Sequence, residues 1–153
     1  MKPILDFAFQ FGAKIALNAE LMVKKGGRYF LLNENLKRLI RRDFYYAGTY
    51  LGKVKNGKFF PSFNLLAMLA KGEANKIVVD RKAAWLFICG RDVFRRGVVA
   101  VYGSRRKGAY TLVLNEFGEC LGFGKITHGL DAEETQVVVK NISDVGDFLR
   151  REV

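Results

Sequence analysis

Apolar and polar residues follow two different periods in the first third of the chain. Between Pro3 and Asn18 the apolar positions recur at helical spacing, and Pro3 suits a first helical turn, which predicts an opening amphipathic helix. Short apolar runs at 20–23 and 28–32 then flank a Lys-Gly-Gly turn. Paired glycines allow the backbone conformation that a tight turn requires, so these runs predict a β-hairpin.

A basic amphipathic helix is expected after this hairpin. Asn33 is a suitable N-cap, and Leu36, Leu39 and Ile40 form one apolar stripe. The rest of the helix surface carries Lys37, Arg38, Arg41 and Arg42. Both RNA and an acidic protein are suitable partners for such a surface.

A second hairpin and a third helix follow. Residues 45–54 predict a strand, Asn56-Gly57 is the strongest turn signal in the chain, and residues 58–60 continue the pairing. Ser62 then caps a helix that is expected to end before Gly72.

The pattern changes after the linker-like stretch 71–75. Apolar runs bounded by turn residues predict strands at 77–79, 98–102, 110–114, 121–126 and 136–139, with helices at 82–88 and 144–151. Short strands separated by glycines suit a small closed or half-open barrel. The sequence therefore predicts an α+β fold, with a small α+β domain at 1–74 and a mixed pseudo-β-barrel at 75–153.

The net charge narrows the class of partner. The chain has 153 residues, with 26 Lys and Arg against 15 Asp and Glu, a net charge of +11. On so small a chain this favours a polyanion, with nucleic acid ahead of a membrane. No window suits a membrane span or a secretory signal, and we expect a cytoplasmic protein. Cys89 and Cys120 lack a second Cys or His at metal spacing and are expected to be core thiols.

The side chains that usually carry acid–base catalysis are nearly absent. His128 is the single histidine, which excludes a Ser-His-Asp triad, a Cys-His pair or a two-histidine metal site within one chain. It lies near Asp131, Glu133 and Glu134, in a stretch that we interpret as a solvated loop. Residues 103–108 imitate a phosphate-binding loop but lack its Lys and Ser/Thr. We expect a protein that is not an enzyme and holds no cofactor or metal.

Basic residues are concentrated in one segment of the second half. Positions 81–107 contain eight basic residues and one acid, Asp92, and six of the eight are Arg. Arg donates bidentate hydrogen bonds to phosphate and stacks on exposed bases, whereas the competing explanation is solubility. Tyr102, at a strand end, suits either base stacking or the core. If Trp85 is a core residue, Trp85→Ala should chiefly destabilise the fold.

Four motifs of the second half occur in a characteristic order. They are Lys76-Ile77-Val78-Val79-Asp80, Cys89-Gly90-Arg91-Asp92-Val93, Val98 to Tyr102, and the hairpin from Leu112 to Gly124. In this order and spacing they resemble the PUA domain, the RNA-binding module named after pseudouridine synthases and archaeosine transglycosylases. The resemblance covers residues 76–142 and implies a small mixed pseudo-barrel, in agreement with the strand pattern.

The first half extends this resemblance. Residues 47–53, the Gly57-Lys58-Phe59-Phe60 motif with its Leu-rich helix, and residues 140–151 are similar to the archaeal and eukaryotic large-subunit ribosome-assembly factors known as nuclear import protein seven. A stretch like 58–62 also occurs in the PUA region at the C-terminus of archaeosine tRNA-guanine transglycosylases. Both families imply a pre-PUA domain at 1–74 and a PUA domain at 75–153, and the choice between them stays open.

One departure from these families moves the expected RNA surface. The last PUA strand of the ribosome factors carries several basic residues, whereas residues 136–140 here include only Lys140. The expected contacts therefore shift to the basic segment, helped by two lysines that neighbouring strands would bring alongside. The predicted RNA-binding residues are Arg81, Lys82, Arg91, Arg95, Arg96, Arg105, Arg106, Lys107, Lys125 and Lys140.

Two functions fit these expectations. The first is a non-catalytic RNA-binding protein of large-subunit ribosome biogenesis, whose first domain contacts a protein partner. The second is the tRNA-recognition subunit of a transglycosylase-type base-modifying enzyme with a separate catalytic chain. A stand-alone enzyme would need acids such as Asp6, Asp43 and Asp131 to converge in one cleft, and nothing in their spacing requires it.

Overall fold

The computed structural model describes the backbone of residues 1–40 and 44–151, and the side chains of these residues except 148, 149 and 151. The elements of the first half are α1 (Lys2–Gln10), η1 (Ala19–Leu21), β1 (Met22–Lys25), β2 (Arg28–Leu31), α2 (Glu34–Leu39), β3 (Thr49–Lys55), β4 (Lys58–Pro61) and α3 (Phe63–Lys71). The elements of the second half are β5 (Lys76–Val79), α4 (Arg81–Ile88), β6 (Val93–Phe94), η2 (Arg95–Gly97), β7 (Val98–Tyr102), β8 (Tyr110–Leu114), β9 (Cys120–Ile126), β10 (Val137–Asp144) and α5 (Val145–Arg151). The α+β class predicted from the sequence is confirmed.

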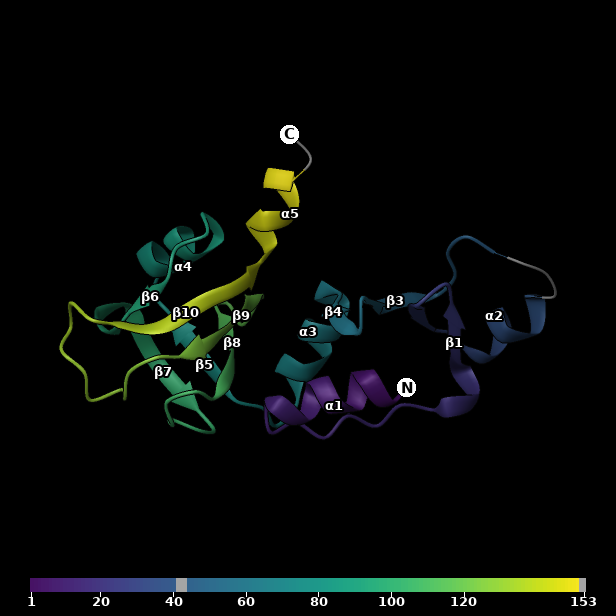
Figure 1. Cartoon of the computed structure of the whole chain (residues 1–153), viewed down its shortest axis with the longest axis horizontal. Coiled ribbons are helices and arrows are strands. Elements are labelled where there is room, and N and C mark those ends of the chain that lie inside the picture. Colours follow the sequence, from purple (N-terminus) through teal and green to yellow (C-terminus); the bar gives the residue numbers. More distant parts are fainter. Residues whose placement is uncertain (41–43, 152–153) are drawn as a thin grey trace.

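Two sheets lie toward opposite ends of the molecule, with α1 and α3 between them (Figure 1). The first sheet has the strand order β1-β2-β3-β4, and the second has the order β6-β10-β9-β8-β5-β7. All neighbouring strands are antiparallel except β5 and β8, which are parallel. The second sheet is therefore mixed, as the resemblance implies.

Local sequence signals place most element ends correctly. Asn33 Oδ1 accepts the Leu36 N–H at 2.8 Å and begins α2, and Ser62 Oγ accepts the Leu65 N–H at 3.1 Å and begins α3. The turn between β3 and β4 has Asn56 at φ 51° and Gly57 at φ 72°. Positive φ at both central positions matches the twist of the strands they connect, and Asn and Gly tolerate it best.

Some element bounds differ from those predicted. Helix α1 ends at Gln10 rather than near Asn18, because Gly12 adopts φ 66° and turns the chain out of the helix. Strand β3 begins at Thr49 rather than Tyr45. Strand β6 was not predicted, since two residues are too short to show a period. Strand β10 continues to Asp144 although its last residues are partly polar. Arg41, Arg42 and Asp43, named as sequence candidates, lie outside the described residues.

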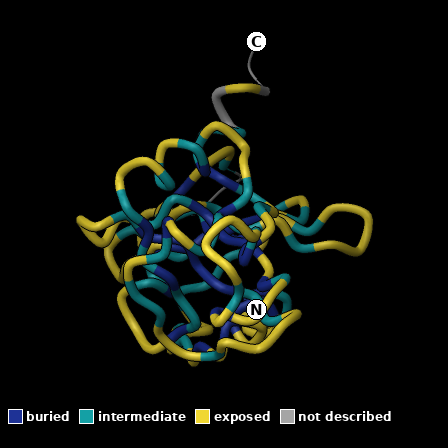
Figure 2. The backbone as a smooth tube through the Cα atoms, turned by 90° about the vertical axis from the view of Figure 1, so that its left-hand side faces the viewer, coloured by how far each residue is buried: buried dark blue, intermediate teal, exposed yellow. Residues whose placement is uncertain are grey.

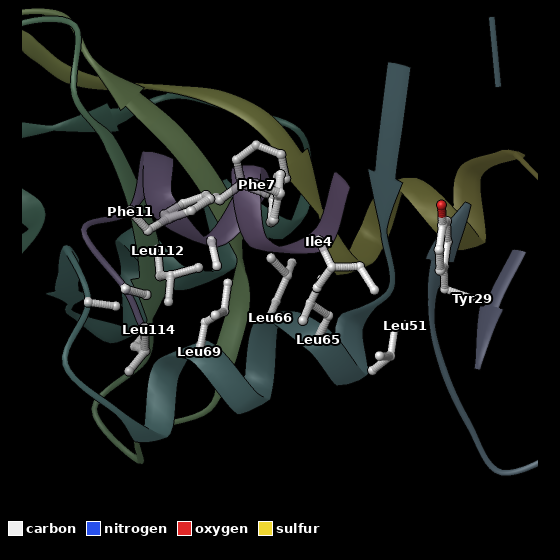
Figure 3. Close-up of a cluster of buried hydrophobic side chains, with 14 residues drawn as sticks. Ile4, Phe7, Phe11, Tyr29, Leu51, Leu65, Leu66, Leu69, Leu112 and Leu114 are labelled. Atoms are coloured by element: carbon white, nitrogen blue, oxygen red, sulfur yellow. The ribbon is translucent and has the colours of Figure 1, made fainter. Parts of the chain in front are cut away.

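The largest core cluster contains residues of both halves. Figure 3 shows side chains of α1 and α3 directed toward Leu112 and Leu114 of β8. The Phe123 ring of β9 lies 5.5 Å from both Phe7 and Phe11 of α1, with interplanar angles of 80° and 83°. Edge-to-face rings of this kind attract each other beyond their burial. The boundary at 74/75 stays a prediction, and the largest core cluster lies across it.

Helix α4 packs on a second core cluster through Phe87, and residues of β10 and α5 hold it in this position. Buried segments concentrate inside the molecule while exposed loops surround them (Figure 2). Arg150 Nη2 pairs with the buried Asp144 Oδ2 at 3.0 Å, and its Nη1 donates to the Ile88 carbonyl at 2.6 Å. Asn141 Nδ2 donates to the Phe87 carbonyl at 2.9 Å. Positive charge stabilises the carbonyl end of a helix, so this network holds α4 on the sheet.

The two cysteines differ in exposure, and the expectation that both are core thiols is wrong for Cys89. Cys89 follows α4 and is exposed, whereas Cys120 begins β9 and is partly buried.

Burial raises the pKa of the Cys120 thiol to about 11. At a pH of roughly 8 about one Cys120 thiol in a thousand would then be the reactive thiolate. We expect iodoacetamide to alkylate Cys89 alone under native conditions, as peptide mass spectrometry would show. Equal labelling of Cys120 would contradict this.

Candidate nucleic-acid interface

The clearest grouping of predicted residues lies where β8, β9 and β10 are adjacent. Lys125 of β9 is directly opposite Lys140 of β10, and on its other side it is opposite Tyr110 of β8. Directly opposed residues point to the same face of a sheet. The Lys125 ammonium lies 5.8 Å from the centre of the Tyr110 ring. Lys125 and Lys140 are therefore neighbours on adjacent strands.

The loop between β7 and β8 adds three further cations beside this row. Asn75 anchors the loop, because its Oδ1 accepts the Ser104 N–H at 2.9 Å and its Nδ2 donates to the Tyr110 carbonyl at 3.1 Å. At the other end of the loop, the Gly108 N–H donates to the Ile126 carbonyl at 2.7 Å. Three exposed side chains project from the loop, those of Arg105, Arg106 and Lys107. We call these three residues with Lys125, Lys140 and Tyr110 the strand-end surface.

The charges of the strand-end surface are uncompensated within the described part of the chain. None of its five cations has a carboxylate of a described residue within ion-pairing distance. Like charges directly opposite each other in a sheet are destabilising. The Lys125–Lys140 pair therefore makes no favourable contribution to folding, and an anion between the two ammonium groups would remove the repulsion.

A second group of predicted residues lies around the start of α4. Arg81 and Lys82 occupy its first turn, which Asp80 caps by accepting the Ala83 N–H at 2.8 Å. Lys82 and Arg96 line a hollow of about 220 Å³ whose other charged residues are Asp80 and Asp92. These two carboxylates make the hollow less positive than the strand-end surface.

Arg91 lies in the turn after α4, and Arg95 begins the short η2 helix. The two side chains differ in their hydrogen bonding. Arg91 is exposed, and its carbonyl accepts a hydrogen bond from Asn141 Nδ2 at 3.3 Å. The partly buried Arg95 donates through Nε to the Leu130 carbonyl at 2.5 Å. Arg95 thus holds the loop between β9 and β10, and its guanidinium is less available to a ligand.

The ten predicted residues therefore form two groups on opposite faces of the second sheet. Helix α4 covers the face that buries Val139 and Ile126, through Phe87. Lys140 and Lys125 are the neighbours of those two buried residues along their strands, so they point away from α4. The structure brings Lys125, Lys140 and the 105–107 loop together. It separates them from the other five predicted residues, which we call the α4 group: Arg81, Lys82, Arg91, Arg95 and Arg96.

The structure also exposes aromatic residues beside both groups. Trp85 is 64% exposed on α4, one turn from Arg81 and Lys82, so it is not a core residue. Tyr102 is 54% exposed, with the Lys76 ammonium 5.8 Å from its ring centre. Tyr110 was not among the predicted site residues. Tyr110 belongs to this surface because it is opposite Lys125 in the register, whereas the next residue, Thr111, is buried on the other face. The sequence does not show this register.

The acidic cluster does not form a metal site. Among the described residues no group of three His, Cys, Asp or Glu side chains could hold a metal ion. His128 Nδ1 lies 2.9 Å from the Val137 carbonyl, and this hydrogen bond joins the ends of the loop between β9 and β10. In the same described part of the chain, every helix is too short or too polar to cross a membrane.

The second half of the chain matches a known protein family. The family model described as the UPF0113 PUA domain matches residues 75–153. The chain belongs to this family. The resemblance to the PUA domain is thereby confirmed, and PUA domains are typically RNA-binding modules. The description of the family names no catalytic activity.

One similar sequence and one similar structure come from Archaeoglobus fulgidus and Thermoplasma acidophilum. A UPF0113 protein from Archaeoglobus fulgidus is 30% identical over 112 residues, which are 71% of this chain and 63% of that protein. The match thus spans less than two thirds of that relative. The structure of a conserved PUA domain protein from Thermoplasma acidophilum has a TM-score of 0.62 at 21% identity, covering 99% of this chain and 92% of that one.

A second full-length structural match supports the same fold. A hypothetical protein from Pyrococcus horikoshii has a TM-score of 0.62 at 19% identity, covering 99% of this chain and 95% of that one. At these identities the two structures establish the shared fold. The three chains therefore share this fold over nearly the whole of the compared lengths.

Proposed function

We propose that this protein is a non-catalytic RNA-binding protein whose strand-end surface holds the ribose-phosphate chain. The observation that carries the proposal is the Lys125–Lys140 pair, placed side chain beside side chain next to the three cations of the 105–107 loop. Such a pair costs folding free energy unless an anion lies across it. A phosphate backbone supplies anions at regular intervals along the row.

Aromatic side chains favour RNA over other polyanions. Tyr110 borders the lysine pair, and the more exposed Tyr102 lies on β7, across the same face of the sheet. Unstacked bases of single-stranded RNA stack on aromatic rings and on Arg guanidinium planes, which neither a lipid headgroup nor a polyphosphate can do. The α4 group, with Arg81, Lys82 and the exposed Trp85, offers a further phosphate and stacking contact of the same kind.

We further propose that the protein acts in the cytoplasm in large-subunit ribosome biogenesis. The sequence resemblance to the nuclear import protein seven factors supports this over tRNA recognition because it also includes residues 140–151. Crosslinking the protein to RNA in cell extract, followed by sequencing of the attached RNA, tests it. Enrichment of ribosomal precursor RNA is expected, whereas enrichment of tRNA would favour the transglycosylase-type alternative.

A salt titration tests the RNA proposal itself. Each phosphate neutralised on a single strand contributes a slope of about −0.7 to log affinity against log salt, so the five cations of the strand-end surface predict about −3.5. Fluorescence anisotropy with a labelled oligouridine measures this slope. Binding that does not change with salt, or no binding at low salt, would contradict the proposal.

A further inference from the structure

The first sheet, which lies toward the other end of the molecule from the second (Figure 1), carries a second set of exposed cations. Next to the β3–β4 turn burial alternates residue by residue, with Val54 and Phe59 packed against the main core cluster and their neighbours exposed. The exposed positions point to the other side of the sheet. The cations there are Arg28, Lys53, Lys55 and Lys58, which we call the N-terminal basic face.

The register of this sheet places like charges directly opposite each other. Arg28 of β2 is opposite Lys53 of β3, and Lys55 of β3 is opposite Lys58 of β4. Lys25 of β1 is opposite Arg28, which continues the row across the sheet. The four strands contain six basic residues and no acidic one. No described carboxylate forms an ion pair with the four residues of the N-terminal basic face.

Aromatic rings lie among these cations. The Arg28 guanidinium carbon lies 5.5 Å from the centre of the Tyr45 ring, which is 80% exposed. The Lys58 ammonium lies 5.5 Å from the centre of the Phe60 ring, which is also exposed. Phe60 is opposite Lys53 in the register, so ring and ammonium share the face. Phosphate-binding cations with interspersed rings are typical of surfaces that hold single-stranded nucleic acid.

A groove of about 480 Å³ lies between Tyr110 of β8 and the β3–β4 turn. Its lining includes Lys58 of the N-terminal basic face and Tyr110 of the strand-end surface. The lining also includes Lys2, Asp6 and Gln10 of α1, so one carboxylate faces the groove beside the two lysines, and the rings of Phe59 and Phe123. A chain leaving Lys125 past Tyr110 can therefore follow this groove to the β3–β4 turn without crossing the body of the molecule.

We propose that the N-terminal basic face is a second RNA-contacting surface, and that single-stranded RNA held at the strand-end surface continues through the groove to reach it. This inference rests on the proposed RNA-binding function and extends it to the first half. Protein–protein interfaces are depleted in Lys and have an apolar centre, whereas this face is rich in Lys and carries isolated rings. Its chemistry therefore fits RNA better than an acidic protein.

The test compares two double variants with the same charge change. Lys53→Gln with Lys55→Gln removes two cations of the face, and Lys14→Gln with Lys71→Gln removes two exposed lysines outside both surfaces. The probes are labelled oligouridines of about 30 and about 8 nucleotides, because a single site of this kind holds roughly 4 to 16. A longer RNA offers more overlapping binding positions, which raises the apparent affinity of both variants by the same factor.

We expect the Lys53/Lys55 variant to bind the longer RNA about 25-fold more weakly than the control at roughly 0.1 M salt, since each phosphate contact contributes about fivefold there. Its salt slope should be shallower by about 1.4. The loss should be smaller with the short RNA, which covers fewer of the cations of the two surfaces at one time. The melting temperature should not fall, because the substitutions remove like-charge repulsion.

Three outcomes would overturn the inference. Equal affinity of the two variants for the longer RNA would show that the N-terminal basic face does not contact RNA. The proposed function would stand in that case if replacing Lys125 and Lys140 still weakened RNA binding. Sensitivity of polyglutamate binding, but not RNA binding, to Lys53 and Lys55 would assign the face to an acidic protein. A lowered melting temperature would assign these lysines a structural role. A wild-type protein that binds neither RNA would instead disprove the proposed function.

Discussion

Replacing Lys125 and Lys140 together by Gln is expected to weaken binding of single-stranded RNA about 25-fold at roughly 0.1 M salt. The two ammonium groups lie side by side on adjacent strands, and each neutralises one phosphate in the proposed complex. Losing two of five contacts should reduce the salt slope from about −3.5 to about −2.1. Anisotropy titrations with labelled oligouridine at several salt concentrations measure both quantities.

The stability of the same variant separates binding from folding. Because the lysines repel each other across the strands, their removal should leave the melting temperature equal or slightly higher. The matched variant Lys125→Arg with Lys140→Arg keeps both charges and should retain the wild-type salt slope. If the Gln variant bound RNA as tightly as the Arg variant, the strand-end surface would not be the contact surface, and the α4 group would become the first candidate.

Phe123→Ala is expected to destabilise the whole chain by about 3–5 kcal/mol. The ring is buried in the core cluster that contains residues of both halves, and it meets Phe7 and Phe11 of α1 edge to face. Its removal leaves a cavity and also takes away these ring contacts. Chemical denaturation followed by circular dichroism gives the free energy of unfolding, and we expect a single transition at lower denaturant.

Phe117→Ala is the matched control, since it deletes the same side chain at a position that is 89% exposed. Its effect on the free energy of unfolding should stay within about 0.5 kcal/mol. Two separate unfolding transitions, with only one shifted by Phe123→Ala, would mean that residues 1–74 and 75–153 unfold independently. A shared transition would mean that the predicted boundary separates domains that nevertheless unfold together.

Several features of the fold were predictable because their signals are local. Asn33 and Ser62 each accept a backbone N–H three residues later, and such a cap depends only on neighbouring atoms. The Asn56-Gly57 turn is equally local, since positive φ at both positions determines how the strands leave it. The resemblance to the PUA domain added the mixed character of the sheet in the second half.

Residues at element ends and on amphipathic helices were harder to place. Trp85 and Cys89 are exposed although their residue types are usually buried, because the apolar stripe of α4 that meets the sheet passes through Phe87. Arginine is a common phosphate ligand, yet the Nε of Arg95 donates a hydrogen bond to the Leu130 carbonyl. That partner is 35 positions away, and no spacing rule relates the two residues.

Composition, charge and local motifs were thus sufficient to determine the α+β class, the hairpins, the helix caps and the preference for a polyanion. The grouping of the cations depends on strand register, which brings Lys125 beside Lys140 and Arg28 beside Lys53. Register depends on contacts between residues distant in sequence, because a strand slipped by one position would turn every side chain to the other face. The folded sheets therefore determine which charges share a surface, and hence where a phosphate chain can bind.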